Sequence, residues 1–223
     1  MGNGTVIVRH VASGTQVHLL CVTRGGAGWN GLPPGRRPEE LTAIRTEELD
    51  RAAAVLGLAS VELWDYPDGG VPACDQDEIT SRIRDAVGRL DPEVVLGWGP
   101  DGGYGHPDHI AVGACTDAAL AGSGRALYHL AFDTKAADAI GEWVARVAPQ
   151  SGMQVAGIER PDVIFEPAPA ELETIKRAVE CHQSQLSPMY RALLDDEAAF
   201  YWLARNGYVR VGEASAAGSS LSL

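Results

Sequence analysis

The chain has 223 residues, of which 45% are hydrophobic and 22% charged, a composition typical of one large folded α/β domain. Its formal net charge of -12 disfavours nucleic acid and anionic membranes as partners, because both are polyanions. No apolar run approaches the roughly 20 residues of a membrane span, and the N-terminus lacks the build of a signal peptide. The 4 cysteines contain no CxxC pair and are typical of reduced thiols, so we expect a cytoplasmic protein.

The elements predicted along the chain alternate between strands and helices. Apolar runs predict strands, and apolar residues spaced by three and four predict helices. We expect strands at 16–23, 60–67, 93–99, 126–132 and 162–167, and helices at 38–57, 75–90, 107–121, 136–147, 169–186 and 192–205. This alternation predicts a Rossmann-like α/β fold, with a mostly parallel sheet and helices on both faces. We expect residues 1–212 to form a single domain and the small, polar residues 213–223 to form a flexible tail.

The segment GGYGHPDH, residues 102–109, follows the third predicted strand. Ligands of such sheets bind at the carboxyl ends of the strands, which favours a functional site here. Pro107 suits the first position of a helix and Asp108 its first turn, so that His106 becomes the cap residue. The two imidazoles can then diverge while staying close, one binding a metal and the other facing a substrate. The alternative is a structural loop, with His106 as a cap and His109 in the core.

This segment resembles the second signature of the zinc-dependent de-N-acetylases of the PIG-L/LmbE-like family. The resemblance extends over most of the chain through weaker matches that follow the family's order. These matches are CVTRGGAG at 21–28, IRTEELDRAAAVLG at 44–57, WDYPDGG at 64–70 and KRAVECHQSQ at 176–185.

The resemblance implies an LmbE-like fold and a Zn²⁺-dependent hydrolase. Such an enzyme removes an acetyl group from an N-acetylglucosaminyl-type or related small conjugate. By the same resemblance His109 is a zinc ligand, and His106 stabilises the oxyanion and helps the amine to leave. Asp108 would orient or tune one of the two rings, as carboxylates near metal ligands do.

One motif of the family is absent from this chain. Family members carry His-Pro-Asp-Asp-Glu after their first strand, and it provides two of three zinc ligands and the general base. The opening MGNGT resembles the residues that directly follow this motif. We therefore expect the first strand to be missing and the chain as given to be inactive or nearly so, because one histidine cannot hold a catalytic zinc. Our hypothesis is that Met1 is an internal start and that a longer natural product carries the strand.

Three further residues are candidates for substrate binding. The resemblance makes Arg45 a substrate-facing group, and the alternative is a surface pair with Glu48. Asp68 lies in a Pro-Asp-Gly sequence that predicts a turn, with a substrate contact in addition. His182 lies on the apolar stripe of its predicted helix, so we expect a buried, hydrogen-bonded ring that could line the site. Trp29 could stack on a sugar or belong to the core.

Two classes of function remain open. The first is the zinc-dependent amidase, whose partner is a small N-acetylated molecule. The second is a truncated, non-catalytic relative that binds a ligand or a protein partner. A homo-oligomer is compatible with either class, and the sequence does not select the substrate. We interpret His10 and His18 as structural, because neither is followed by an aspartate at ligand spacing, and His129 as structural because it lies inside a predicted strand.

Overall fold

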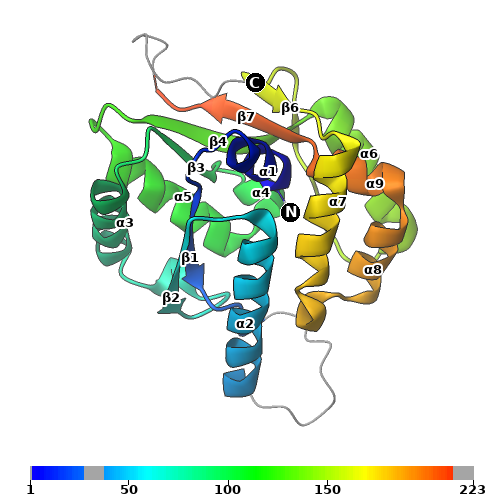
Figure 1. Cartoon of the computed structure of the whole chain (residues 1–223), viewed down its shortest axis with the longest axis horizontal. Helices are drawn as coiled ribbons and strands as arrows, with labels where there is room; N and C mark the ends of the chain where they lie inside the picture. The colour runs from blue at the N-terminus through cyan, green and yellow to red at the C-terminus, as the bar shows by residue number, and fades with distance from the viewer. Residues whose placement is uncertain (1, 28–37, 213–223) are drawn as a thin grey trace.

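The computed structural model describes residues 2–27 and 38–212, and Figure 1 labels its elements. The strands are β1 (His18–Thr23), β2 (Ser60–Tyr66), β3 (Val94–Trp98), β4 (Ala126–Asp133), β5 (Gly157–Ile158), β6 (Val163–Phe165) and β7 (Asn206–Arg210). The α-helices are α1 (Gly4–Ala12), α2 (Pro38–Leu56), α3 (Gln76–Leu90), α4 (Gly102–Gly105), α5 (Pro107–Leu120), α6 (Thr134–Val147), α7 (Pro169–Glu180), α8 (Pro188–Asp195) and α9 (Glu197–Ala204). Two 3₁₀ turns are η1 (Val71–Ala73) and η2 (Gln183–Gln185). The predicted tail and Trp29 lie outside the described residues.

Local signals decide where α3 begins and ends. The carboxylate of Asp75 accepts hydrogen bonds from the backbone N–H groups of Asp77 and Glu78, at 3.0 and 3.1 Å. This is the bonding of an N-cap residue, and it satisfies donors that have no partner within the helix. Asp91 ends the helix with a φ of 49°, in the left-handed region. The helix predicted at 75–90 is therefore confirmed nearly to the residue.

The strands form two sheets, one parallel and one of mixed direction. β1 pairs in parallel with β2, with His18 opposite Ser60. β3 pairs in parallel with β4, with Val94 opposite Ala126. β7 is antiparallel to both β4 and β6, so the second sheet has the order β3-β4-β7-β6, and β5 pairs with β4. The predicted α/β fold is confirmed, with β7 as an antiparallel strand that the prediction missed.

Helices cover both faces of the sheets (Figure 1). One core cluster contains buried residues of β1, β2, β4, η1, α3 and α5. A second contains buried residues of α1, β4, β6 and β7. Leu127 of β4 belongs to the first cluster and its neighbour Tyr128 to the second, and successive side chains of a strand point to opposite faces. α3 and α5 therefore lie on one face and α1 on the other, while α6 to α9 pack together in a third cluster.

β1 and β3 each keep one open edge among the described strands. β1 pairs only with β2, and β3 pairs on one side with β4. All five residues of β3 are only half-buried, whereas six of the eight residues of β4 are buried. Half-buried Leu20 of β1 and Val95 of β3 nevertheless pack on the same core cluster. The two sheets thus share one core, and each contributes to it an edge strand that is unpaired on one side.

Two predicted helices end differently in the structure. The helix predicted at 169–186 stops at Glu180 and is followed by η2. The helix predicted at 192–205 is two helices, because Asp196 ends α8 and caps α9 by accepting a hydrogen bond from the Ala199 N–H at 3.1 Å. Capping by an aspartate in mid-run starts a new helix.

Candidate active site

The glycine-rich segment forms a tight turn at the carboxyl end of β3. Gly102 and Gly103 have φ values of 62° and 78°, in the left-handed region that favours glycine. α5 then packs unusually close to β3, since a Cβ at Gly113 would lie 2.5 Å from the carbonyl oxygen of Trp98. This contact holds the start of α5, with Pro107 as its first residue, beside the end of the strand.

His106 caps α5, as the sequence predicts. Its Nδ1 atom accepts a hydrogen bond from the backbone N–H of Asp108 at 3.2 Å. A nitrogen that accepts a hydrogen bond carries no proton, so the proton of the neutral ring lies on Nε2. His106 therefore offers an N–H donor from the atom that is not used in the cap.

His109 has the opposite arrangement. Its Nδ1 atom lies 3.0 Å from the carbonyl oxygen of Gly102, which can only accept, so Nδ1 carries the proton. The lone pair of the neutral ring is then on Nε2, the arrangement found in metal-binding histidines. Burial lowers the pKa of His109; the bond to the Gly102 carbonyl opposes this shift, and the neighbouring His106 adds to it. The neutral form, which is able to bind a metal, is thereby favoured.

Aromatic neighbours hold the two imidazoles in place. The His109 ring stacks on the indole of Trp98, with centroids 3.8 Å apart and planes at 9°. The ring of His106 stacks on the other side, at 4.5 Å and 28°, and Tyr104 presents its edge to both rings. The imidazoles therefore lie stacked and do not diverge. His109 is half-buried.

Asp108 connects α5 to the turn that follows β2. Its side chain is 5% exposed, and its two oxygens accept the backbone N–H groups of Gly69 at 2.7 Å and Val71 at 3.1 Å. The atom of Asp108 that contacts the His106 ring is its backbone nitrogen. The carboxylate thus fixes the turn, and the role expected for it in tuning a ring stays a prediction.

Asp68 lies in the predicted turn, where the Gly70 N–H bonds to the Pro67 carbonyl at 3.0 Å. Its carboxylate accepts hydrogen bonds from Thr23 Oγ1 at 3.4 Å and from the Ala27 N–H at 2.9 Å, so it also holds the loop after β1.

The charge of Asp68 reaches three groups of the candidate site. Burial lowers the pKa of Arg45 and of His109, and Asp68 opposes both shifts. Burial raises the pKa of Tyr104, and Tyr190 and Asp68 add to that shift. Asp68 therefore influences the pKa of side chains on both α2 and the histidine loop.

Arg45 and Glu48 are buried, so the alternative of a surface pair is wrong. Arg45 is 6% exposed and Glu48 2% exposed. The carboxylate of Glu48 accepts two hydrogen bonds of 2.7 Å from Ser184, one from its backbone N–H and one from its hydroxyl. Arg45 Nε donates to the same hydroxyl at 3.4 Å. These bonds join α2 to η2, and we call this buried contact, formed by Arg45, Glu48 and Ser184, the seam.

His182 precedes η2 and lies beyond the end of α7, which stops at Glu180. The ring is half-buried, and its Nδ1 accepts a hydrogen bond from Gln185 Nε2 at 3.1 Å, which places the ring proton on Nε2. Burial lowers its pKa, and the charges of Glu48 and Arg45 act on it in opposite directions. His182 is therefore part of the same seam as Arg45.

The described residues do not by themselves fit a zinc ion. Within residues 2–27 and 38–212 no three His, Cys, Asp or Glu side chains come together as a metal site. Asp108 is next to His109 in the sequence, and Asp68 lies in the turn after β2. Both carboxylates accept hydrogen bonds from backbone N–H groups. A catalytic zinc takes three protein ligands.

Sequence reasoning missed Trp98, Tyr104 and Ser184 as neighbours of the candidate residues. Tyr104 lies two positions before His106 inside the same motif, and this position was the available signal. Ser184 meets Glu48 only through the tertiary fold, across 136 residues of sequence. The three histidines interpreted as structural are each hydrogen-bonded, to Val6 O, Ser60 Oγ and Asp117 Oδ1.

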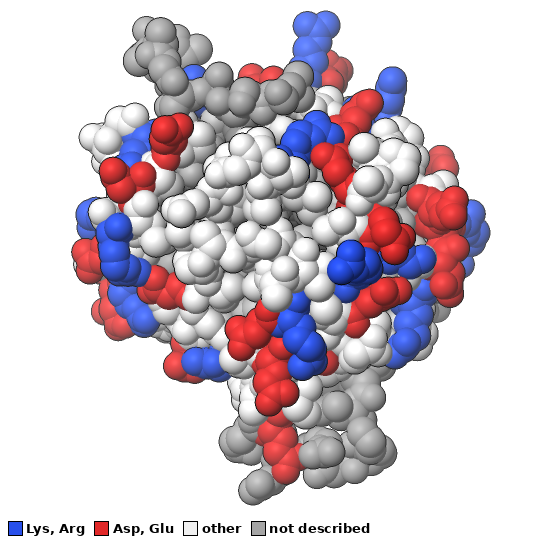
Figure 2. Space-filling view, viewed as in Figure 1, with Lys and Arg blue, Asp and Glu red and all other residues white. Residues whose placement is uncertain are grey.

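The surface above α1 carries few charges. Figure 2 shows a broad uncharged area left of the centre, with acidic and basic side chains around it. Figure 1 places α1 and the strands behind it in the same region. No helix in the described part of the chain is long and apolar enough to cross a membrane.

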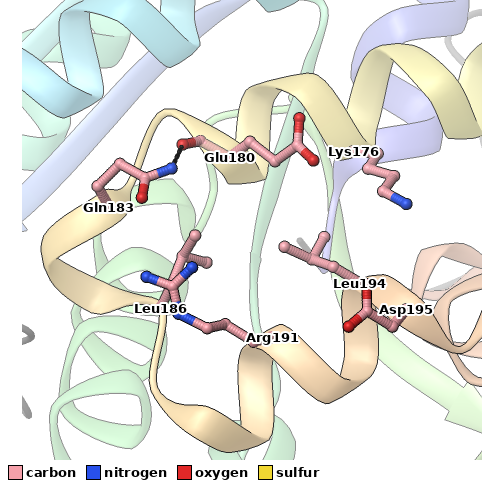
Figure 3. A pocket seen from close by; sticks show the side chains of 7 residues that line it. All are labelled: Lys176, Glu180, Gln183, Leu186, Arg191, Leu194 and Asp195. Atoms are coloured by element: carbon pink, nitrogen blue, oxygen red, sulfur yellow. Dashed lines mark hydrogen bonds between the residues drawn. The ribbon is translucent and has the colours of Figure 1, made fainter.

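A cavity of about 350 Å³ lies away from the histidine loop, between α7 and α8. Figure 3 shows Lys176 and Glu180 on α7 facing Arg191 and Asp195 on α8. It contains none of the predicted site residues, and its charged side chains are exposed or half-exposed. The candidate site therefore lies around His106 and His109 and not in this cavity.

Comparison with protein families identifies a family for this chain. The model described as "PIG-L: GlcNAc-PI de-N-acetylase" matches residues 1–120. A 1D-myo-inositol 2-acetamido-2-deoxy-alpha-D-glucopyranoside deacetylase of Kineococcus radiotolerans is 32% identical over 148 residues. That alignment covers 54% of this chain and 41% of the relative, so the chain spans less than half of the relative's length.

Solved structures of similar fold include enzymes of two kinds. N,N'-diacetylchitobiose deacetylase of Pyrococcus horikoshii has a TM-score of 0.61 at 19% identity, covering 94% of this chain and 78% of that chain. GalB, the 4-carboxy-2-hydroxymuconate hydratase of Pseudomonas putida KT2440, has a TM-score of 0.65 at 18% identity, covering 97% of this chain and 92% of that chain. The fold therefore carries more than one reaction.

Proposed function

Because the chain belongs to the PIG-L family of de-N-acetylases, we propose that it forms part of an enzyme that hydrolyses an acetamide. The proposed substrate is an N-acetylglucosaminyl-type or related small conjugate, and the products are acetate and a free amine. One observation carries the proposal: hydrogen bonds leave His106 with an N–H donor and His109 with a lone pair, on stacked rings 4.5 Å apart.

His106 can serve the two points of the reaction at which charge develops. When water adds to the acetamide carbonyl, its oxygen becomes negative, and the Nε2–H of His106 can donate to it. When the C–N bond breaks, the departing nitrogen needs a proton, which the same ring can supply as an imidazolium, after its Nδ1 has taken up the proton that the attacking water releases. Tyr104, whose ring edge faces His106, helps to fix the ring that does this.

His109 is the proposed zinc ligand, and its partners must come from outside the described residues. We propose that they lie on a strand that occupies the position between β1 and β3. The open edges of these strands and their shared core support this. So does α1, which covers the sheet and leads into parallel β1, because a helix normally connects two parallel strands.

A buried polar atom near the start of α1 gives separate support for the additional strand. Asn206 is fully buried, and its Oδ1 accepts the backbone N–H groups of Thr5 and Val6 at 3.1 and 3.4 Å. Its Nδ2 has no hydrogen-bond partner among the described residues. Buried N–H groups normally have a partner. We propose that a carbonyl oxygen of the segment that precedes α1 is this partner.

Arg45, Asp68 and His182 are the proposed substrate contacts. In support of this, Asp68 acts electrostatically on both Arg45 of α2 and His109 of the histidine loop. A guanidinium suits hydroxyl oxygens and anionic groups of a sugar conjugate. The Nε2–H of His182 is a further donor toward the same substrate.

The alternative function is a non-catalytic relative that binds a ligand or a partner. The lack of a three-donor metal site among the described residues favours it. In that case the residues upstream of Met1 in the reading frame would not encode a strand that ends in metal-binding side chains.

Acetate release decides between the two functions. The chain preceded by its in-frame upstream residues should release acetate from N-acetylglucosamine conjugates, and its His106→Ala variant should lose about 10²–10⁴-fold in kcat. The 223-residue chain is the matched control and should be inactive. A stop codon directly upstream, or an inactive extended chain that binds the conjugate, would support the non-catalytic alternative.

A further inference from the structure

Three side chains from two distant parts of the chain form a buried hydrogen-bonded series. Arg45, Glu48 and Ser184 are 6%, 2% and 2% exposed. Glu48 lies one turn after Arg45 on α2, and Ser184 lies on η2. We infer that Glu48 and Ser184 are positioning residues, which set the orientation of the Arg45 guanidinium toward the candidate site.

The direction of each hydrogen bond carries this inference. Glu48 accepts from the backbone N–H and from the hydroxyl of Ser184, both at 2.7 Å. A serine hydroxyl has one proton to donate, and here it is used in the hydrogen bond to Glu48. The hydroxyl can therefore only accept from Arg45 Nε, which lies 3.4 Å away. Glu48 thus fixes the hydroxyl, and the hydroxyl fixes one edge of the guanidinium.

A second contact limits the other edge of the guanidinium. A Cβ at Gly25 would lie 3.3 Å from Arg45 Nη1, so this nitrogen lies against the loop that follows β1. Asp68 accepts the Ala27 N–H of the same loop and acts electrostatically on Arg45. Arg45 Nε thus bonds to η2, while Arg45 Nη1 lies beside the Gly25 loop. The plane of the guanidinium, which determines where its five N–H donors point, is fixed by these contacts.

The inference rests on the proposed function for one part only, the assignment of Arg45 to a hydroxyl or anionic group of the substrate. In that role a fixed guanidinium lowers the cost of ordering the side chain when the substrate binds. Loss of the series should then weaken substrate binding more than it slows the chemical step.

The orientation itself can be measured on the 223-residue chain by NMR. We expect the Arg45 Nε–H to exchange with water at least tenfold faster in Ser184→Ala and in Glu48→Gln. Glu48→Gln keeps the shape of the side chain but replaces one acceptor by a donor, which reverses the bond to the hydroxyl. The matched controls are Ser187→Ala, which removes the cap of α8, and Glu47→Gln on the exposed face of α2; both should leave the rate unchanged.

Equal exchange rates in all four variants would overturn the inference. If Ser184→Ala does not fold, Glu48→Gln decides, since every backbone hydrogen bond can remain in that variant. In the extended, active chain both variants should raise KM about tenfold or more with kcat changed less than threefold. A fall in kcat at unchanged KM would contradict a positioning role. An inactive extended chain would count against the proposed function, while the exchange rates would still decide the inference.

Discussion

His106 and His109 are three residues apart, and their hydrogen bonds place the ring protons on different atoms. The backbone N–H of Asp108 donates a hydrogen bond to Nδ1 of His106, whereas the Nδ1–H of His109 donates one to the Gly102 carbonyl oxygen. Nitrogen-15 NMR at neutral pH should therefore show an Nε2–H tautomer for His106 and an Nδ1–H tautomer for His109. Finding one and the same tautomer for both rings would contradict their division into a donor and a ligand.

The Asp108 carboxylate should contribute more to stability than its place in a helical first turn implies. In Asp108→Ala two backbone N–H groups, of Gly69 and Val71, lose their acceptor, which should cost about 1–3 kcal/mol of unfolding free energy. Asp117→Ala on the same helix removes a half-exposed partner of His129 and should cost less than about 1 kcal/mol. Urea unfolding of both variants measures the difference, and equal losses would contradict the role of Asp108 in the turn.

At this scale the sequence predicted local bonding but not bonding between distant segments. His106 as a cap, Pro107 at the first helical position and Asp108 in the first turn follow from adjacent residues, and the structure confirms them. The burial of Arg45 and Glu48 could not be predicted, because it depends on Ser184, whose position relative to α2 is set only by the tertiary fold.

Among the elements, α5 depends on one glycine for its contact with β3. Gly113→Ala should destabilise the protein by about 1–3 kcal/mol, because its Cβ would lie 2.5 Å from the Trp98 carbonyl oxygen and the helix must move away. Gly88→Ala is the matched control within α3: nothing lies within 4 Å of a Cβ there, so it should stabilise by about 0.5–1 kcal/mol. Thermal unfolding compares the two, and a loss of similar size in both variants would refute the close packing.

α1 is tied to α7 by an ion pair that should make stability depend on pH. Arg9 Nε donates to Glu171 at 2.8 Å, and this bond lowers the pKa of Glu171 below its ordinary 4.5. A carboxyl with a lowered pKa in the folded state stabilises the fold above its unfolded value, and the contribution is lost as the pH falls through the folded pKa. Glu171→Gln should therefore lower Tm at pH 7, and its deficit should shrink below about pH 4.5. A deficit that is the same at pH 7 and pH 3 would contradict this.

The strands and helices of residues 16–147 follow from their periodicity, and the predicted spans largely coincide with β1, α2, β2, α3, β3, α5, β4 and α6. β7 was missed because Gly207 interrupts a short strand, although a Cβ there would lie 2.7 Å from Ala131 O and glycine is therefore required. The carboxyl-terminal helices were merged because the capping role of Asp196 is weak as a sequence signal when its neighbours Asp195 and Glu197 are also acidic.

For the whole molecule, the open edges of β1 and β3 are the feature that connects fold to function. They lie over one core, beside the loop that holds His106 and His109, and no metal site is complete in the described part of the chain. The family relation predicted from the motif at 102–109 is confirmed by the match over residues 1–120. The substrate could not be predicted, because substrate choice depends on loops and on the parts of the relatives that this chain does not span.

Zinc content of the purified protein is the most direct test of the central claim. The chain extended by its in-frame upstream residues should bind one zinc per molecule, and both its His109→Ala variant and the unextended chain should bind less than a tenth as much. Equal zinc content with and without His109, or full zinc binding by the 223 residues alone, would contradict a site that His109 shares with a strand between β1 and β3.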